Sequence, residues 1–220
     1  MGLVGESALL PCNVDVASCG EVYFITWTKN TSTEWKRLYL YSDDVEKPLQ
    51  ELANPDRADF MVEESTAYLR ISPLEMDDEG SYKCDVTYVQ GKCPSLSYAH
   101  LIIMLKPSPP IISKDGEILK HASTIGPFLE GTTLSLECKT TGGKPSPEVT
   151  WSNGSESLLS RGSIADDELG TSNVTSSIRF VLSRSDLGAR LGCHVKHDTV
   201  EEEMVKWVEV DVHGKTNFGN

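Results

Sequence analysis

The sequence lacks any apolar run of the roughly 20 residues that a helix needs to cross a bilayer. It also lacks the apolar core of a signal peptide, because Glu6 interrupts the only apolar stretch near the amino terminus. We therefore expect a fragment excised from the extracellular part of a longer protein.

Motifs for catalysis and metal binding are missing as well. There is no Gly-x-Ser-x-Gly elbow, no phosphate-binding glycine loop and no zinc-protease helix. No cysteine has a second one two to four residues away, which argues against a zinc site. His194 and His197 are three apart and would face opposite sides of a strand, so we interpret them as surface histidines. The acidic clusters lack the spacing of a calcium loop. We expect no enzyme activity, no cofactor and no metal.

Basic residues are few, with 20 lysines and arginines against 33 acidic residues and a net charge of −13. Residues 1–106 alone carry nine basic and 17 acidic side chains. Such a surface repels phosphate, which excludes nucleic acid as a partner. Two interpretations of the acidity remain: solubility, or complementarity to a basic partner, which would speed encounter.

What the sequence does contain is an ordered set of cysteines and aromatic residues. Cys12 is followed by Trp27, and the run Asp-Glu-Gly-Ser-Tyr-Lys-Cys ends at Cys84. Tyr82 stands two residues before Cys84, so on a strand both face inward, and the tyrosine hydroxyl can bond to the preceding loop. Cysteine, tryptophan and then this run is the order of an immunoglobulin-like β-sandwich.

The chain is long enough for two such sandwiches. We predict an all-β protein with a variable-type domain at 1–106, a constant-like domain at 107–213 and a tail at 214–220. The first assignment depends on an additional strand at Trp35–Tyr41, for which the long Cys12–Cys84 separation has room. Cys138 and Cys193 lie closer together, which is typical of a constant-like domain.

The six cysteines indicate an oxidising compartment, outside the cell or at its surface. We expect the bridges Cys12–Cys84, Cys19–Cys93 and Cys138–Cys193. The second joins two loops at one end of the first domain, and a free reactive thiol is its alternative. The sequons at Asn30, Asn153 and Asn173 predict glycosylation.

Alternation predicts which side chains face outward on the first sheet. Ile25 and Trp27 should point inward, and so should Leu38 and Leu40. The outward set on these two strands is then Phe24, Thr26, Thr28, Arg37, Tyr39 and Tyr41. At the base of the domain, Arg57 is the expected cation opposite Asp78.

Several segments together resemble the first two immunoglobulin domains of the Sidestep family of insect neuronal surface proteins. They are Leu10-Pro11-Cys12, Leu69-Arg70-Ile71 with the run ending at Cys84, Gly131–Cys138, Gly142–Trp151 and Arg184–Cys193.

This resemblance implies a membrane-anchored ectodomain that binds Beaten path proteins in axon guidance and synaptic partner choice. It implies that binding uses the front sheet of the first domain, and aromatic residues and arginine are typical of binding hot spots. By position the partner-binding residues are Thr26, Thr28, Arg37, Tyr39, Tyr41, Lys83, Asp85 and Thr87. A glycan on Asn30, which ends a strand of this sheet, is expected to point away from the partner. The alternatives are a plain solvated face, a homophilic nectin-like adhesion module, and a secreted soluble receptor fragment.

Overall fold

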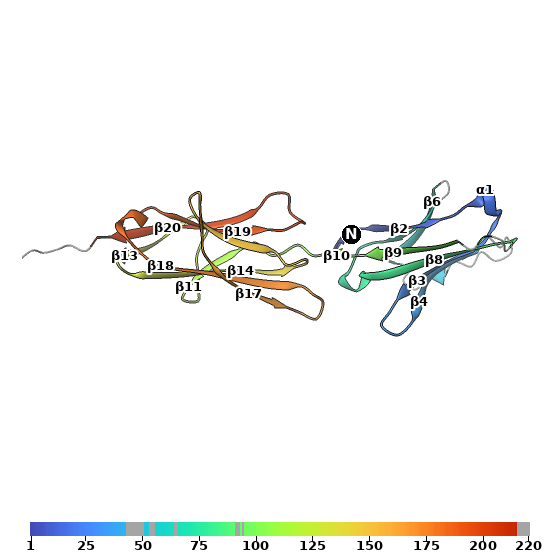
Figure 1. The fold of residues 1–220 in the computed structure, drawn as a ribbon, viewed down its shortest axis with the longest axis horizontal. Coiled ribbons are helices and arrows are strands. Elements are labelled where there is room, and N and C mark those ends of the chain that lie inside the picture. Colours follow the sequence, from blue (N-terminus) through green and yellow to red (C-terminus); the bar gives the residue numbers. More distant parts are fainter. Residues whose placement is uncertain (43–50, 53–55, 64–65, 91–92, 94, 215–220) are drawn as a thin grey trace, which may run out of the picture. The chain divides into compact units, whose positions relative to one another are not determined.

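The computed structural model describes residues 1–42, 51–52, 56–63, 66–90, 93 and 95–214. The chain divides into two units, Met1–Met104 and Leu105–Asn220, and both are built from β-strands (Figure 1). Leu105 belongs to the second unit because it exchanges two backbone hydrogen bonds of 3.0 Å with Lys144. The all-β prediction is confirmed.

The first unit is a sandwich of two antiparallel sheets. The front sheet has the strand order β5-β4-β3-β8-β9, the back sheet has the order β2-β7-β6, and β1 pairs in parallel with β10. The elements of this unit are β1 (Gly2–Leu3), β2 (Ala8–Asn13), α1 (Val16–Cys19), β3 (Val22–Asn30), β4 (Trp35–Ser42), β5 (Glu51–Leu52), β6 (Ala58–Glu63), β7 (Thr66–Ile71), the 3-10 turn η1 (Met76–Asp78), β8 (Gly80–Tyr88), β9 (Ser95–Leu101) and β10 (Ile103–Met104).

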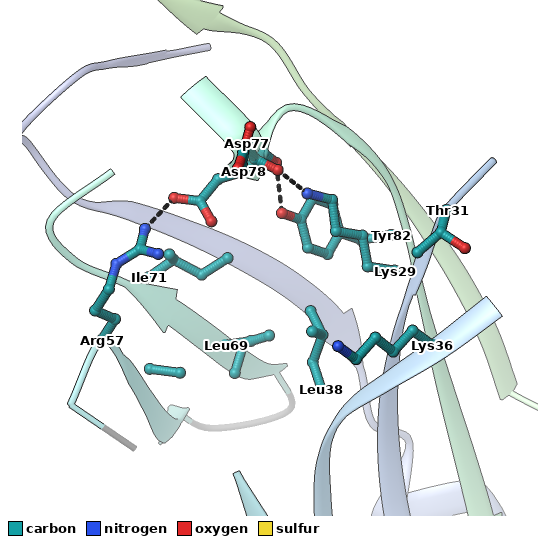
Figure 2. Close-up of a pocket in the computed structure, with 11 residues that line it drawn as sticks. Lys29, Thr31, Lys36, Leu38, Arg57, Leu69, Ile71, Asp77, Asp78 and Tyr82 are labelled. Carbon is teal, nitrogen blue, oxygen red and sulfur yellow. Dashed lines mark hydrogen bonds and ion pairs between the residues drawn. The ribbon is translucent and has the colours of Figure 1, made fainter. Parts of the chain in front are cut away.

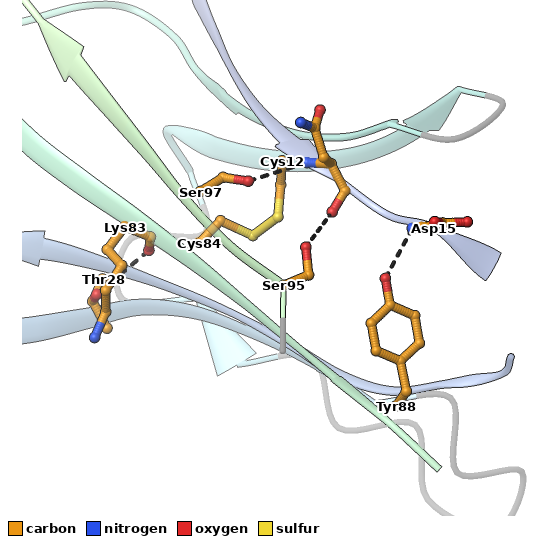
Figure 3. Close-up of a disulfide and its surroundings, with 9 residues drawn as sticks. Cys12, Asp15, Thr28, Lys83, Cys84, Tyr88, Ser95 and Ser97 are labelled. Carbon is orange, nitrogen blue, oxygen red and sulfur yellow. Dashed lines mark hydrogen bonds between the residues drawn. A yellow bond between two sulfur atoms is a disulfide. The ribbon is translucent and has the colours of Figure 1, made fainter. Parts of the chain in front are cut away.

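The core of this unit lies between the sheets around the Cys12–Cys84 disulfide (Figure 3). Trp27 and both cysteines are fully buried. On β7, Ala67, Leu69 and Ile71 are buried, as the period of two predicts.

The edge strand β9 is tied to the back sheet through small side chains. Ser95 Oγ donates to the Asn13 carbonyl at 2.9 Å, and the Asn13 amide donates to Ser97 Oγ at 3.4 Å (Figure 3). The serines of β9 therefore face inward, and the residues between them face solvent.

The base of the first unit has the expected tyrosine corner. The Tyr82 hydroxyl donates to the Asp78 carbonyl, and the Arg57 guanidinium pairs with the Asp78 carboxylate (Figure 2). Arg57 also bonds Glu75 at 2.9 Å. Burial raises the pKa of the Tyr82 phenol above its ordinary value, so this donor keeps its proton.

At the other end, Cys19 of α1 is joined to Cys93. The three disulfides link the pairs expected from the sequence, and no described cysteine is free. The sequence also predicts a hairpin turn at Gln90-Gly91-Lys92 and an exposed connection from Asp43 to Asp56, and most of both segments lies outside the described residues.

The strict alternation predicted for β4 is wrong. Trp27 pairs with Tyr39, but Thr28 pairs with Arg37, so Leu38 is an additional residue in the ladder. Such a β-bulge changes the face on which later side chains lie. Tyr39 therefore points into the core with Trp27, whereas Arg37 remains on the outer face.

The second unit is also a two-sheet sandwich, with Cys138 and Cys193 joined between the sheets and Trp151 buried in the core. Its sheets have the orders β12-β11-β14-β18-β17 and β13-β20-β19-β15-β16. The elements are β11 (Ile111–Lys114), β12 (Glu117–Ile118), β13 (Ser123–Leu129), β14 (Thr133–Gly143), β15 (Glu148–Asn153), β16 (Glu156–Leu158), β17 (Arg161–Asp166), β18 (Ser172–Val181), η2 (Arg184–Asp186), β19 (Arg190–Lys196) and β20 (Met204–His213).

Candidate functional site

The candidate site is the outer face of the front sheet in the first unit. Ladder pairing places Arg37, Thr28, Lys83 and Tyr98 in one row across β4, β3, β8 and β9. A neighbouring row contains Leu40, Thr26, Asp85 and Leu96. We define the front face as Phe24, Thr26, Thr28, Trp35, Arg37, Leu40, Lys83, Asp85, Thr87, Leu96 and Tyr98.

An aromatic cluster lies at one end of the front face. The rings of Trp35 and Tyr98 meet edge to face with centroids 6.3 Å apart. The Lys83 ammonium lies 5.3 Å from the Trp35 ring, which is cation–π distance. Trp35 is 40% exposed, Tyr98 is 66% exposed and the nearby Leu96 is 49% exposed. These contacts hold large side chains in place while leaving their surfaces accessible.

Six of the eight expected partner-binding residues lie on the front face. They are Thr26, Thr28, Arg37, Lys83, Asp85 and Thr87. Asp85 and Thr87 are exposed, as is Arg37.

Tyr39 and Tyr41 do not lie there, and this part of the prediction is corrected. Tyr39 is fully buried with its ring stacked on Phe60 of β6 at 4.8 Å, and Tyr41 stacks on the same ring at 5.1 Å. The bulge at Leu38 turns both tyrosines inward. Burial, followed by the neighbouring Tyr41 and Asp59, raises the pKa of the Tyr39 phenol above its ordinary value.

Sequence reasoning missed Trp35, Leu96 and Tyr98. Trp35 stands two residues before Arg37 and shares its face, so the phase of this strand already indicated it. In β9 the usual pattern is reversed, with serines inside and large residues outside. The inward serines fit because β9 lies against β2, a contact that local pattern does not reveal.

The sequon residue Asn30 lies beside the aromatic cluster. Asn30 pairs with Trp35 across β3 and β4, and directly opposed residues project from the same side of a sheet. Asn30 is exposed. A glycan on Asn30 would leave from the edge of the front face, and the expectation that it points away from a partner stays a prediction. The other sequon residues, Asn153 and Asn173, lie on β15 and β18 of the second unit.

The interpretation of both histidines as surface residues is half wrong. His197 is buried, and its Nε2 donates to the Pro145 carbonyl at 2.8 Å. His194 is partly exposed and bonds Glu203 at 3.0 Å.

Within the described ranges, no group of three or more His, Cys, Asp or Glu side chains could hold a metal ion. No helix in the described part of the chain has the length and apolarity to span a membrane.

Comparison with known families assigns both sandwiches. Residues 1–102 match the immunoglobulin V-set domain, and residues 117–203 match the CD80-like C2-set immunoglobulin domain. The chain therefore consists of two tandem immunoglobulin domains, a V-set domain followed by a C2-set domain.

Comparison with individual proteins gives the class to which its relatives belong. Human cell adhesion molecule 2 is 28% identical over 201 residues, which cover 89% of this chain and 40% of that protein. The Rst D1–D2 structure matches with a TM-score of 0.73 at 20% identity, covering 96% of this chain and 94% of that one. The mouse nectin-like molecule 4 ectodomain matches with a TM-score of 0.71 at 18% identity, covering 97% and 66%.

The chain is homologous to immunoglobulin-superfamily cell adhesion molecules, and it spans about two fifths of the length of the first relatives. These adhesion proteins are a non-enzymatic class, in agreement with the absence of catalytic motifs in the sequence.

Proposed function

We propose that this chain is the recognition part of a cell-surface protein and that it binds another immunoglobulin-superfamily protein through the front face of its V-set domain. Following the resemblance to the Sidestep family, we propose a partner of the Beaten path type and a role in axon guidance and synaptic partner choice. The second domain acts as a spacer. The single observation that carries the proposal is the exposed cluster of Trp35, Tyr98 and Lys83.

The composition of this cluster supports recognition. Tryptophan, tyrosine and arginine are enriched among the hot spots of protein interfaces, and Arg37 lies in the same row as Tyr98. The Trp35–Tyr98 and Lys83–Trp35 contacts restrict the side chains before a partner arrives. Binding then costs less conformational entropy.

The second unit has less exposed aromatic surface that could bind a partner than the front face of the first unit has. Its Trp207 ring is covered by the Arg190 guanidinium at 4.7 Å and by the His121 ring at 5.6 Å. Among its exposed apolar residues, Leu159 lies in the connection between β16 and β17 and Val181 lies at the end of β18, and single exposed apolar side chains are normal.

A binding screen tests the proposal. The chain is immobilised and exposed to a panel of extracellular immunoglobulin proteins that includes Beaten path proteins. Trp35→Ala and Tyr98→Ala should each weaken binding to the partner found. Tyr68→Ala is the matched control, since Tyr68 lies on β7 of the back sheet and faces away from the core. The V-set domain alone should bind, and binding by the C2-set domain alone would contradict the proposal.

Homophilic adhesion is the second candidate, and the homology to cell adhesion molecules favours it. The same front face would then bind its own copy. Sedimentation velocity at rising concentration distinguishes the two: a dimer that Tyr98→Ala abolishes supports homophilic binding, and a monomer throughout supports the heterophilic proposal.

A further inference from the structure

One long sheet edge of the second unit is left open. Three of the four edge strands in residues 105–214 are protected: β12 and β16 have only two and three residues, and β13 contains Pro127 and a register shift. The fourth, β17 (Arg161–Asp166), pairs only with β18 and has six residues without proline or lysine (Figure 1). Every residue from 159 to 170 is exposed. A further strand can therefore reach this edge.

The backbone of β17 is also arranged to pair with a further strand. The Asp167 amide donates to the Thr171 carbonyl at 3.0 Å, which continues the β17–β18 register by one residue. In an antiparallel ladder the N–H and C=O groups of successive residues point alternately to one neighbouring strand and to the other. The groups of Gly162, Ile164 and Asp166 therefore point away from β18, toward the open edge.

The charges along β17 separate into a basic and an acidic end. Arg161 begins the strand, and Arg179 of β18 lies diagonally beside it on the same face, because Arg161 pairs with Ser177. Asp166 and Asp167 lie at the other end. A second strand that runs antiparallel to β17 would meet complementary charge at both ends if its own charges had the same order.

The exposed side chains are placed symmetrically about Ile164, which is 60% exposed. Arg161 and Asp167, of opposite charge, lie three residues before and three residues after it. Leu159 and Leu169 lie five residues before and five residues after it, and they are 100% and 53% exposed. This order makes the edge complementary to itself when it is rotated by half a turn about Ile164.

We infer that β17 pairs with β17 of a second copy of this chain, in antiparallel orientation and with Ile164 opposite its own copy. In this register Gly162 of each copy lies opposite Asp166 of the other, so the open N–H and C=O groups bond one another. Arg161 of each copy lies opposite Asp167 of the other. The contact is closed by a two-fold axis, as in most homodimers. An unrelated extended peptide could satisfy the backbone groups, but the symmetric order of the side chains selects a second copy.

The dimer is expected to be weak in solution. Two edges of this length bury less than the roughly 1,200 Å² of a standard stable interface. We therefore expect a dissociation constant of about 0.1 mM, or about −5.5 kcal/mol. A glycan on Asn173 would not block the contact, because Asn173 pairs with Ala165 and projects from the face of the sheet, whereas the contact uses its edge.

Sedimentation velocity of the two-domain chain, at concentrations from about 10 μM to about 1 mM, brackets the expected dissociation constant. Ile164→Lys should abolish the dimer because it places two like charges opposite each other, and the exposure of Ile164 makes a folding defect unexpected. Arg161→Glu should weaken the dimer at least about tenfold, since both ends then carry like charges. Lys139→Glu is the matched control, a charge reversal at an exposed residue of β14 in the same sheet, and should dimerise as wild type does.

Mixing two charge variants tests the register. Arg161→Glu and Asp167→Arg should each dimerise weakly alone, whereas their equimolar mixture should dimerise as wild type does, because the heterodimer restores both charge pairs. Ile164→Cys tests the centre. In a hydrogen-bonded antiparallel pair the Cα atoms lie about 5.5 Å apart, which suits a disulfide, so mild oxidation should link two copies of this variant. Ser135→Cys, at an exposed position of β14, should not link.

Three results would overturn the inference. They are a monomer at every concentration, a dimer that Ile164→Lys leaves intact, and a mixture of the folded charge variants that associates no better than either variant alone. A dimer that Tyr98→Ala abolishes and Ile164→Lys does not would belong to the front face. The two surfaces are therefore tested separately, and the inference does not depend on the proposed partner.

Discussion

Tyr39 provides a test of the bulge in β4, because replacing it with alanine and replacing it with phenylalanine should change the free energy of unfolding in opposite directions. The ring is fully buried and stacked on Phe60, so Tyr39→Ala should lower the free energy of unfolding of the first unit by about 3–5 kcal/mol. The hydroxyl is buried without a hydrogen-bond partner among the described residues. Tyr39→Phe removes this unsatisfied group and should raise the free energy of unfolding by about 1 kcal/mol.

Hydrogen exchange of the buried β3 and β8 amides measures the free energy of unfolding of the first unit separately from that of the second. Tyr98→Ala is the control, because its side chain is 66% exposed and its loss should change stability by less than about 0.5 kcal/mol. If Tyr39 instead faced solvent, both of its substitutions would resemble the control. That result would refute the inward orientation and restore strict alternation in β4.

Three further predictions concern charge, glycosylation and pH. If the acidity of the first domain serves recognition, charge reversal at Asp85 of the front face should slow association with the partner more than charge reversal at Glu202 of the second unit. Salt should reduce the wild-type association rate, because it shortens the Debye length from about 10 Å at 0.1 M to about 3 Å at 1 M. Surface plasmon resonance measures both effects, and an association rate that does not depend on salt would mean that the acidity serves solubility. Removing the Asn30 sequon with Ser32→Ala should strengthen partner binding of glycosylated protein without altering unglycosylated protein, whereas equal binding of both glycosylated forms would mean that the glycan leaves the front face clear. Hydrogen bonds from the Thr171 side chain and amide lower the pKa of the Asp167 carboxyl in the folded chain. The ionised carboxylate therefore stabilises the fold above the pKa of aspartate in the unfolded chain, about 3.9, and this stabilisation is lost as the pH falls below that value. In urea titrations the difference in the free energy of unfolding between wild type and Asp167→Asn should shrink from pH 7 to pH 3, and a constant difference would contradict this.

Most of the fold could be predicted because strong local signals coincide. Cys12, Trp27 and the run that ends at Cys84 determine the sandwich, and the period of two in β7 identifies its core face. The pairing of Cys19 with Cys93 followed from the ends at which their loops emerge. Each of these features follows from the order and spacing of particular residues along the chain and does not depend on how one strand pairs with another.

The face of β4 could not be predicted in the same way. The bulge at Leu38 is a property of how β4 pairs with β3, and the segment contains no glycine or proline to indicate it. Tyr98 and Leu96 were missed for a related reason. The serines of β9 face inward because of their hydrogen bonds to β2, which lies far away in the sequence.

The recognition role of the front face is tested most directly by the affinity of one partner for matched variants. Surface plasmon resonance of a Beaten path-type partner should show that Trp35→Ala and Tyr98→Ala each weaken binding by about 30-fold, equivalent to about 2 kcal/mol for a hot spot, while the back-sheet variant Tyr68→Ala binds as wild type. Binding that survives both front-face substitutions in folded protein, or that is lost equally in Tyr68→Ala, would contradict the account.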